Sequence, residues 1–292
     1  MDPAQVLKTI RDQKLLIHLL GESLVDIWHY GYLGRPCQER PDIQRFHTWS
    51  TETMEGGAAN VRVSLAAVTR MAVSHITTPP GILKTRFWDK KADQLIFRHD
   101  MDRQSAPCFA PEDLREPLVI ADYGKAFLNW DMFAAISGKC KNVVFSPHLV
   151  NCEKRQRHIP IPEGMRDWLW IVNSEELAAL GEVSLPHLVV TQADKPVVVW
   201  TSPQEYKLVI TENVIVPHAV GIGDVFLAAL APAYFAGVEL LEAVEFAGWV
   251  ATRVLKAGRK GTCHIEEDDL AQVQEAACED DGHRTGTSEV ET

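Results

Sequence analysis

The sequence lacks several features by which a protein is assigned to a broad class. No apolar run approaches the length of a membrane span, and the first residues show no basic region followed by an apolar block. We therefore expect no membrane segment and no secretion signal, and we expect a cytoplasmic protein. The six cysteines are widely spread without a Cys-x-x-Cys pair, which predicts free thiols and no tetrahedral metal site.

Positive charge is also scarce. The chain has 29 Lys and Arg residues against 40 Asp and Glu residues, and its net charge of −11 argues against a nucleic-acid partner. No Gly-x-Gly-x-x-Gly follows the first expected strand, so a dinucleotide-dependent oxidoreductase is a poor interpretation. Hydrophobic residues make up 46% of the 292 residues, enough for the core of one large α/β domain or two small ones.

Strand-like and helix-like segments alternate along the chain. A helix expected over residues 3–12 precedes a buried strand that ends at Gly21, and the pair Gly56-Gly57 opens another helix. From residue 117 onward the pattern is that of βαβ units. This alternation predicts a mostly parallel sheet covered by helices on both faces.

One stretch combines a β-branched segment, two glycines and an aspartate. We expect a strand over 208–216 that leads into Gly221-Ile222-Gly223-Asp224, with a helix over 225–236 behind it. The exposed N–H groups of Gly221, Ile222 and Gly223 suit an anion. Asp224 would then be a general base that takes a proton from a hydroxyl attacking a phosphoryl group. The alternative is an ordinary strand-to-helix turn with Asp224 as the N-cap.

Short elements in a fixed order carry a family resemblance. They are Gly21–Gly31, Gly56–Val61, Lys84–Arg86, Asp122–Lys125, Asn173–Glu176 and Gly221–Asp224. Their order over residues 17–265 resembles the ribokinase-type (PfkB) carbohydrate kinases, and within them the heptose-7-phosphate kinase branch. The resemblance implies an α/β ribokinase-like domain over 1–275, with a β lid near 27–54 and 84–100. We expect the acidic stretch 276–292 to be disordered.

The resemblance also implies an activity and residue roles. It implies a kinase that transfers a phosphoryl group from ATP, with Mg²⁺, to a hydroxyl of a sugar or sugar phosphate, heptose phosphate included. Asp224 would be the base and residues 221–223 the anion hole. The sugar would contact Asp26, Gly56, Gly57, Asn60, Lys84, Arg86, Asp122 and Lys125. The nucleotide would contact Asn173, Glu176, Thr191 and Gly248, with Glu176 holding Mg²⁺ through water.

Some of these assignments have structural alternatives. Lys84 and Arg86 share one face of a strand and suit a phosphorylated substrate, but the same pattern fits a solvated strand face. Asn173 and Glu176 also fit the capped start of a helix. Lys125 equally fits an ordinary surface charge.

The sequence departs from the family on the side of the nucleotide. The glycines of the expected turn after Thr191 are absent, and His218 replaces an acidic residue. Ser146-Pro147-His148 replaces Asp-Pro-Lys, and Gly248 replaces asparagine beside Trp249. We infer a weak or altered nucleotide preference, with Trp249 stacking on the base or blocking it. The alternative function is a degenerate fold that binds a sugar phosphate or a protein partner without turnover.

Two further expectations concern the lid and the sheet. Aromatic residues crowd the lid segments: Trp28, Tyr30, Tyr32, Phe46, Trp49, Phe87 and Trp88. They predict a homodimer in which two lids pair, unless they roof the sugar pocket. Only residues 69–83 separate the glycine-pair helix from Lys84, which is too short for the family's βα unit and predicts a narrower sheet.

Overall fold

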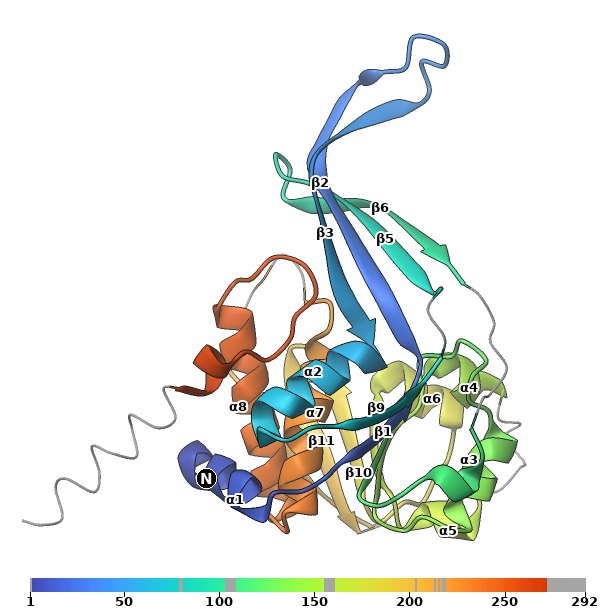
Figure 1. Cartoon of the computed structure of the whole chain (residues 1–292), viewed down its shortest axis with the longest axis vertical. Helices are drawn as coiled ribbons and strands as arrows, with labels where there is room; N and C mark the ends of the chain where they lie inside the picture. Colours follow the sequence, from blue (N-terminus) through green and yellow to red (C-terminus); the bar gives the residue numbers. More distant parts are fainter. Residues whose placement is uncertain are drawn as a thin grey trace, which may run out of the picture.

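Two β-sheets organise the structure, which is a computed structural model (Figure 1). The structure describes residues 2–78, 81–102, 109–154, 161–202, 204–212, 214, 216 and 219–271. His218 and the tail expected over 276–292 lie outside the described residues.

The larger sheet has eight strands and forms the centre of the body. In spatial order they are β12 (Glu205–Val209), β11 (Lys195–Ser202), β10 (Leu188–Gln192), β9 (Leu169–Asn173), β8 (Val143–Ser146), β7 (Leu118–Ala121), β1 (His18–Gly21) and β4 (Ser74–Thr77). The strands from β10 to β4 are parallel, and β11 and β12 are antiparallel additions at one edge. The predicted α/β architecture is confirmed.

Apolar side chains on both faces of this sheet build two cores. Successive strand residues point to opposite faces, so Leu19 and Val119 belong to one core while Leu20 and Ile120 belong to the other. The helices of the first core are α1 (Pro3–Gln13), α2 (Ala58–Thr69), α7 (Ile222–Phe235) and α8 (Leu240–Lys256). Opposite them lie α3 (Trp130–Ser137), α4 (Leu149–Lys154), α5 (Glu163–Arg166), α6 (Ser174–Leu180) and the short 3-10 helix η1 (Pro111–Asp113) (Figure 1).

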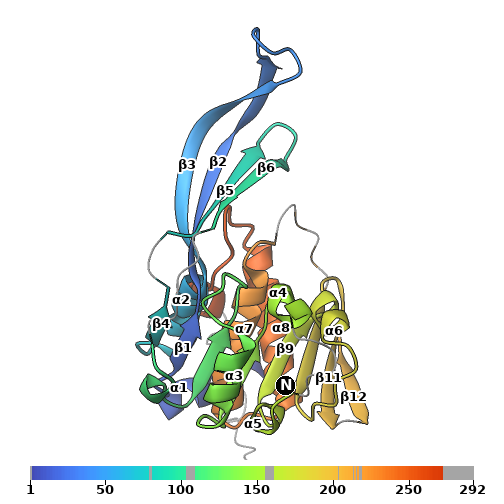
Figure 2. The same cartoon turned by 90° about the vertical axis from the view of Figure 1, so that its right-hand side faces the viewer.

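The smaller sheet is the lid. Its strands are β3 (Gln44–Gly57), β2 (Ser23–Pro36), β5 (Leu83–Asp89) and β6 (Gln94–Met101), in that spatial order. Figure 2 shows the lid standing on one end of the body, with the β2–β3 hairpin reaching beyond the β5–β6 hairpin. Parallel pairing of β2 with β5 places Asp26 beside Lys84 and Trp28 beside Arg86. We call the face that carries these four side chains the lid underside.

The strand expected over 208–216 is wrong beyond Val209. β12 ends there, paired with Val197 of β11, and the residue opposite the next position would be Pro196, which has no N–H group to continue the ladder. The apolar residues Val214 and Val216 line a cavity instead. Their β-branched composition therefore reflects a cavity wall and not a strand.

The connection between α2 and the lid is as short as the sequence implies. Among the described residues of 70–82 the only strand is β4, which pairs with β1 at the edge of the sheet. No described helix is long and apolar enough to cross a membrane.

Candidate functional site

Polar side chains gather where the parallel strands of the body end. Because parallel strands share one carboxyl edge, Glu22 after β1, Asp122 after β7 and Asn173 at the end of β9 lie along the same edge. The N-terminus of α7 reaches this edge, since Asp224 and Asn173 line the same cavity. In open α/β sheets this is the edge at which ligands bind.

Glycine is required at the start of α7. Gly221 is the N-cap and has φ of 86°, in the left-handed region. A Cβ at this position would lie 2.6 Å from the carbonyl oxygen of Cys263. Asp224 is therefore not the N-cap, and the interpretation of Asp224 as a capping residue is wrong. It lies in the first turn, with its carboxylate free for other contacts.

Both carboxylate oxygens of Asp224 accept hydrogen bonds from distant parts of the chain. Asn60 Nδ2 donates to Oδ2 at 2.8 Å, and Tyr123 Oη donates to Oδ1 at 2.5 Å. Asn60 is itself fixed by a 2.9 Å hydrogen bond to the carbonyl oxygen of Cys263. Burial raises the pKa of Asp224 to about 6, against the opposing effect of Asn60, Tyr123 and the charge of Lys84. Asp224 is thus a carboxylate whose pKa suits proton transfer near neutral pH.

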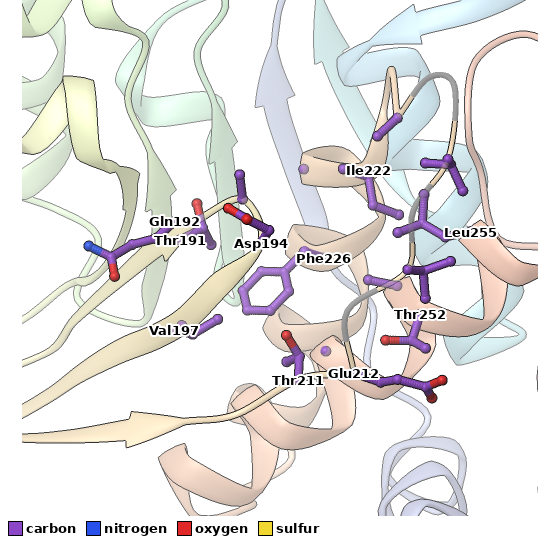
Figure 3. A pocket seen from close by; sticks show the side chains of 17 residues that line it. Thr191, Gln192, Asp194, Val197, Thr211, Glu212, Ile222, Phe226, Thr252 and Leu255 are labelled. Atoms are coloured by element: carbon purple, nitrogen blue, oxygen red, sulfur yellow. The ribbon is translucent and has the colours of Figure 1, made fainter.

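Two cavities meet at the start of α7. The larger, of about 590 Å³, lies between the β10–β11 turn, α7 and α8. Figure 3 shows Asp194, Phe226 and Thr252 around it. The smaller, of about 170 Å³, contains Asp224. Because Thr191, Gly223 and Phe226 line both cavities, a ligand in the larger one can present a group to Asp224.

The predicted nucleotide residues divide between these cavities. Thr191 and Gly248 line the larger cavity, and Asn173 and Glu176 line the smaller one together with Thr191. Asn173 Oδ1 accepts the N–H of Glu176 at 2.9 Å, and Glu176 Oε2 accepts the N–H of Asn173 at 2.8 Å. Asn173 and Glu176 therefore form the capped start of α6 and also line the smaller cavity.

Glu176 is the candidate residue for Mg²⁺. Burial raises its pKa to about 7. The described residues contain no group of three or more His, Cys, Asp or Glu side chains that could hold a metal ion. A single carboxylate fits Mg²⁺ that keeps most of its waters and binds phosphate oxygens of a ligand.

Trp249 does not line the larger cavity, so it would neither stack on a base bound there nor block it. Trp249 stacks on Phe246, with ring centroids 6.5 Å apart, and lies 5.0 Å from the guanidinium of Arg253. It is absent from the lining of the larger cavity, because neighbouring helix positions point about 100° apart. A Cβ at Gly248 would lie 2.3 Å from Thr211 Cγ2, so Thr211 fills the space beside this glycine.

The turn after Thr191 forms without glycine. Ala193 has φ of 53° and joins β10 to β11 together with Asp194. Asp194 lines the larger cavity. The lining of that cavity contains no lysine or arginine among the described residues, so phosphate groups would have to be held by backbone N–H groups and by residues of the smaller cavity.

The glycine pair brings the lid close to α2. Gly57 has φ of 59°, and a Cβ there would lie 2.5 Å from the carbonyl oxygen of Glu22. A Cβ at Gly56 would lie 2.7 Å from Asp26 Oδ2. Gly57 therefore permits close approach to the backbone of Glu22, and Gly56 permits close approach to Asp26. Direct contact of either glycine with a sugar stays a prediction.

The carboxylate of Asp26 is already engaged within the protein. Arg86 Nη1 forms a buried ion pair with Asp26 Oδ1, and Thr262 Oγ1 donates to Oδ2 at 2.7 Å. Trp28 Nε1 donates to Thr262 Oγ1 at 3.2 Å. The charge of Arg86 is thus balanced within the protein by Asp26, and a contact of Arg86 with a substrate phosphate stays a prediction.

Lys84 is left as the candidate cation for an anionic substrate. It forms no ion pair among the described residues, and its ammonium lies 6.0 Å from the centre of the Tyr123 ring. Burial lowers its pKa, against the opposing charge of Asp26. Lys125, by contrast, pairs with Asp102 at 2.7 Å.

Asp122 shapes a turn with the help of a residue that the sequence did not indicate. Asp122 Oδ1 accepts the N–H of Gly124 at 2.9 Å, and Oδ2 accepts Asn151 Nδ2 at 2.8 Å. The buried Glu22 accepts the N–H groups of Tyr123 at 2.8 Å and Lys125 at 3.1 Å. Burial, together with the charge of Asp122, raises the pKa of Glu22 to about 7. The sequence signal that could have indicated Glu22 is an acidic residue directly after a buried strand.

Comparison with known proteins agrees with this geometry. No protein-family profile and no curated protein sequence matches the chain. Among solved structures, ribokinase from Thermotoga maritima superposes with a TM-score of 0.65 at 16% identity, covering 89% of this chain and 99% of the other. The chain has the ribokinase fold.

Two more ribokinase-fold enzymes superpose over most of their length. Phosphofructokinase-2 from Escherichia coli has a TM-score of 0.61 at 13% identity, covering 90% of this chain and 99% of that one. Ribokinase from Arabidopsis thaliana, solved with ribose and ATP, has a TM-score of 0.57 at 12% identity, covering 89% of this chain and 98% of that one. At such identities the likeness concerns the fold.

The first prediction concerns the buried ion pair of the lid. Arg86→Met leaves Asp26 buried without its partner, and we expect a loss of about 3–5 kcal/mol in the free energy of unfolding, measured by urea titration. Arg62→Met, which removes a partly exposed pair with Glu55, should cost about 1 kcal/mol or less. The double variant Asp26→Asn/Arg86→Met should recover part of the stability. Additive losses in the double variant would contradict this account.

Proposed function

We propose that this protein is a kinase that transfers a phosphoryl group from ATP to a hydroxyl of a sugar phosphate. The observation that carries the proposal is the position of Asp224, at the junction of the two cavities and in the first turn of α7. The likeness to sugar kinases supports it at the level of the fold.

The larger cavity suits the nucleoside of the donor. Its volume of about 590 Å³ falls within the range of small-molecule sites, and its wall of Val197, Phe226 and Leu255 offers apolar surface to a base. The phosphates would then extend toward the N–H groups of Gly221 and Gly223. The N–H of Ile222, which the sequence assigned to the same anion hole, donates to the carbonyl oxygen of Ala219 at 3.1 Å. Asn173 and Glu176 lie where they can organise the waters of Mg²⁺, which when bound neutralises phosphate charge.

The reaction follows from the surroundings of Asp224. The acceptor hydroxyl enters from the side of the lid, and its proton passes to the carboxylate of Asp224. Its oxygen forms a bond to the γ-phosphorus while the bond from that phosphorus to the bridging oxygen breaks, and the electron pair leaves with ADP. The N–H groups of Gly221 and Gly223 stabilise the charge on the transferred group.

Lys84 supports an acceptor that already bears an anionic group. Lys84 is largely buried and forms no ion pair with a described carboxylate, and the charge of Asp26 opposes the effect of burial only in part. A substrate phosphate would compensate the lost hydration. A heptose phosphate belongs to the panel of acceptors to be tested, with pentose and hexose phosphates beside it.

The second prediction concerns the base. Asp224→Asn removes the proton acceptor but keeps the size of the side chain, so we expect the rate of phosphoryl transfer to fall by about 10²–10⁴-fold or more. Acceptor binding, measured by calorimetry, should stay close to that of the wild type. A variant that retains the wild-type kcat would remove Asp224 from the mechanism.

The third prediction concerns selectivity for phosphorylated acceptors. Lys84→Met should raise KM for a sugar phosphate by about 10-fold to 150-fold, the effect of one charge-assisted contact, and should leave KM for the free sugar nearly unchanged. Lys207→Met, at an exposed position on β12, is the matched control. Equal changes for both sugars would show that Lys84 does not bind the phosphate.

The degenerate fold remains the competing function, and ligand binding decides between the two. A thermal-shift titration of ATP against the protein with Mg²⁺ should raise the unfolding temperature, because a ligand of the native state stabilises it by mass action. If no nucleoside triphosphate binds at millimolar concentration and no acceptor is phosphorylated, the degenerate interpretation replaces the kinase.

The lid aromatics form two groups. Trp28, Tyr30 and Trp88 are buried, packed together with Met54 and Val220 on the lid underside. On the opposite face Phe87 contacts Phe46 and Phe97, with ring centroids 5.4 and 5.8 Å away. Trp28, Tyr30 and Trp88 thus fit the alternative in which aromatic residues cover the sugar pocket. The group around Phe87 fits an interface with a second lid.

The fourth prediction is a homodimer through this outer face of the lid. Phe97 is 57% exposed on β6, and burying it against a second lid would remove apolar surface from water. The wild type should sediment as a dimer at micromolar concentration and Phe97→Glu as a monomer. Leu208→Glu, at an equally exposed site on β12, should not change the mass. A monomeric wild type would contradict the prediction.

A further inference from the structure

Tyr123 contacts Asp224 directly, and no sequence motif predicted this contact. Its hydroxyl donates to Asp224 Oδ1 at 2.5 Å, across 101 positions of sequence. The two residues line the same small cavity. The contact is therefore part of the proposed active site and not of the core beneath it.

The backbone of Tyr123 is held by the turn that follows β7. The N–H of Tyr123 donates to Glu22 Oε2 at 2.8 Å, and the N–H of Lys125 donates to Glu22 Oε1 at 3.1 Å. Asp122 closes the turn by accepting the N–H of Gly124 at 2.9 Å. Two buried carboxylates thus fix the point from which the phenol reaches Asp224.

We propose that Tyr123 is a positioning residue of the phosphoryl transfer: its hydroxyl holds the carboxylate of Asp224 toward the acceptor and keeps it ionised. The inference rests on the proposed function. Each carboxylate oxygen has two acceptor sites, so the contacts of Tyr123 and Asn60 leave one site on each oxygen for the acceptor hydroxyl. The phenol stabilises the base without occupying the position of the substrate.

The protonation states of the pair support this role. Burial and the charge of Asp224 raise the pKa of Tyr123 well above its usual range, so the phenol stays protonated and donates. The same hydrogen bond lowers the pKa of Asp224 against the effect of burial. Without it, Asp224 would titrate at higher pH, and less of the ionised base would be present near neutral pH.

Other charged and titratable groups also face this pair. They are Lys84 on β5, Asp26 on β2, the thiol of Cys263, His148 and Glu176 in the small cavity, and Glu22 and Asp122 behind Tyr123. Lys84 lowers the pKa of Asp224 and Asp26 raises it. Removal of the Tyr123 hydroxyl changes none of them, so a shift in Tyr123→Phe reports the lost hydrogen bond.

The test compares Tyr123→Phe with Tyr206→Phe, which removes the same atom at an exposed site on β12. Asp224 is titrated directly by carboxyl NMR of protein labelled with ¹³C-aspartate, and Asp224→Asn assigns its signal. We expect the pKa of Asp224 to rise by about one unit or more in Tyr123→Phe and to stay unchanged in Tyr206→Phe. The acid limb of kcat/KM should move to higher pH by the same amount.

The opposite outcome is equally clear. A pKa of Asp224 that stays within about 0.3 units of the wild type overturns the proposal, even if kcat falls, because a merely structural role lowers activity without moving the titration. The NMR titration needs no turnover. Failure of the kinase proposal is therefore distinguishable from failure of the role of Tyr123.

Discussion

The structure depends on how the N-terminus of α7 is held at the carboxyl edge of the sheet. The carboxylate of Asp224 is tied to α2 by Asn60 and to the turn after β7 by Tyr123. Asn60 also binds the carbonyl oxygen of Cys263, in the segment after α8. Three separate parts of the chain therefore converge on one helix end. This convergence fixes a buried carboxylate, a helix N-terminus and two cavities in one place.

The lid depends on a second buried interaction. Asp26 on β2 and Arg86 on β5 pair within the lid, and Thr262 connects that pair to the body. Because Trp28 donates to the same threonine, the lid underside is anchored to the segment after α8. The Asp26–Arg86 pair balances its own charges, and Lys84 forms no ion pair among the described residues.

Periodicity was sufficient for the fold but not for the contacts within the site. The alternation of strands and helices predicted the parallel sheet. A strand that is buried on both faces has a continuous apolar sequence, as in residues 118–121. The same reasoning failed beyond Val209, where Val214 and Val216 line a cavity. It did not foresee that Arg86 pairs with Asp26, because that pair joins positions 60 residues apart. Glu22 and Tyr123 were missed for the same reason, as their partners are equally remote in sequence.

The residues that differ from the family pattern on the expected nucleotide side leave a cavity open. A cavity of about 590 Å³ remains between the β10–β11 turn and α8, and Trp249 packs away from it. Ala193 adopts the left-handed conformation that a glycine would take more easily. Among the described residues, the lining carries the carboxylates of Asp194 and Glu212 and no lysine or arginine.

The most direct test of the central claim is a crystal structure of the full chain with Mg²⁺ and β,γ-imido ATP. We predict that the nucleoside lies in the larger cavity and that the γ-phosphate lies within hydrogen-bonding distance of the N–H groups of Gly221 and Gly223, facing Asp224. A nucleotide bound elsewhere, or a γ-phosphate directed away from the N-terminus of α7, would contradict the assignment of this helix end as the site of phosphoryl transfer.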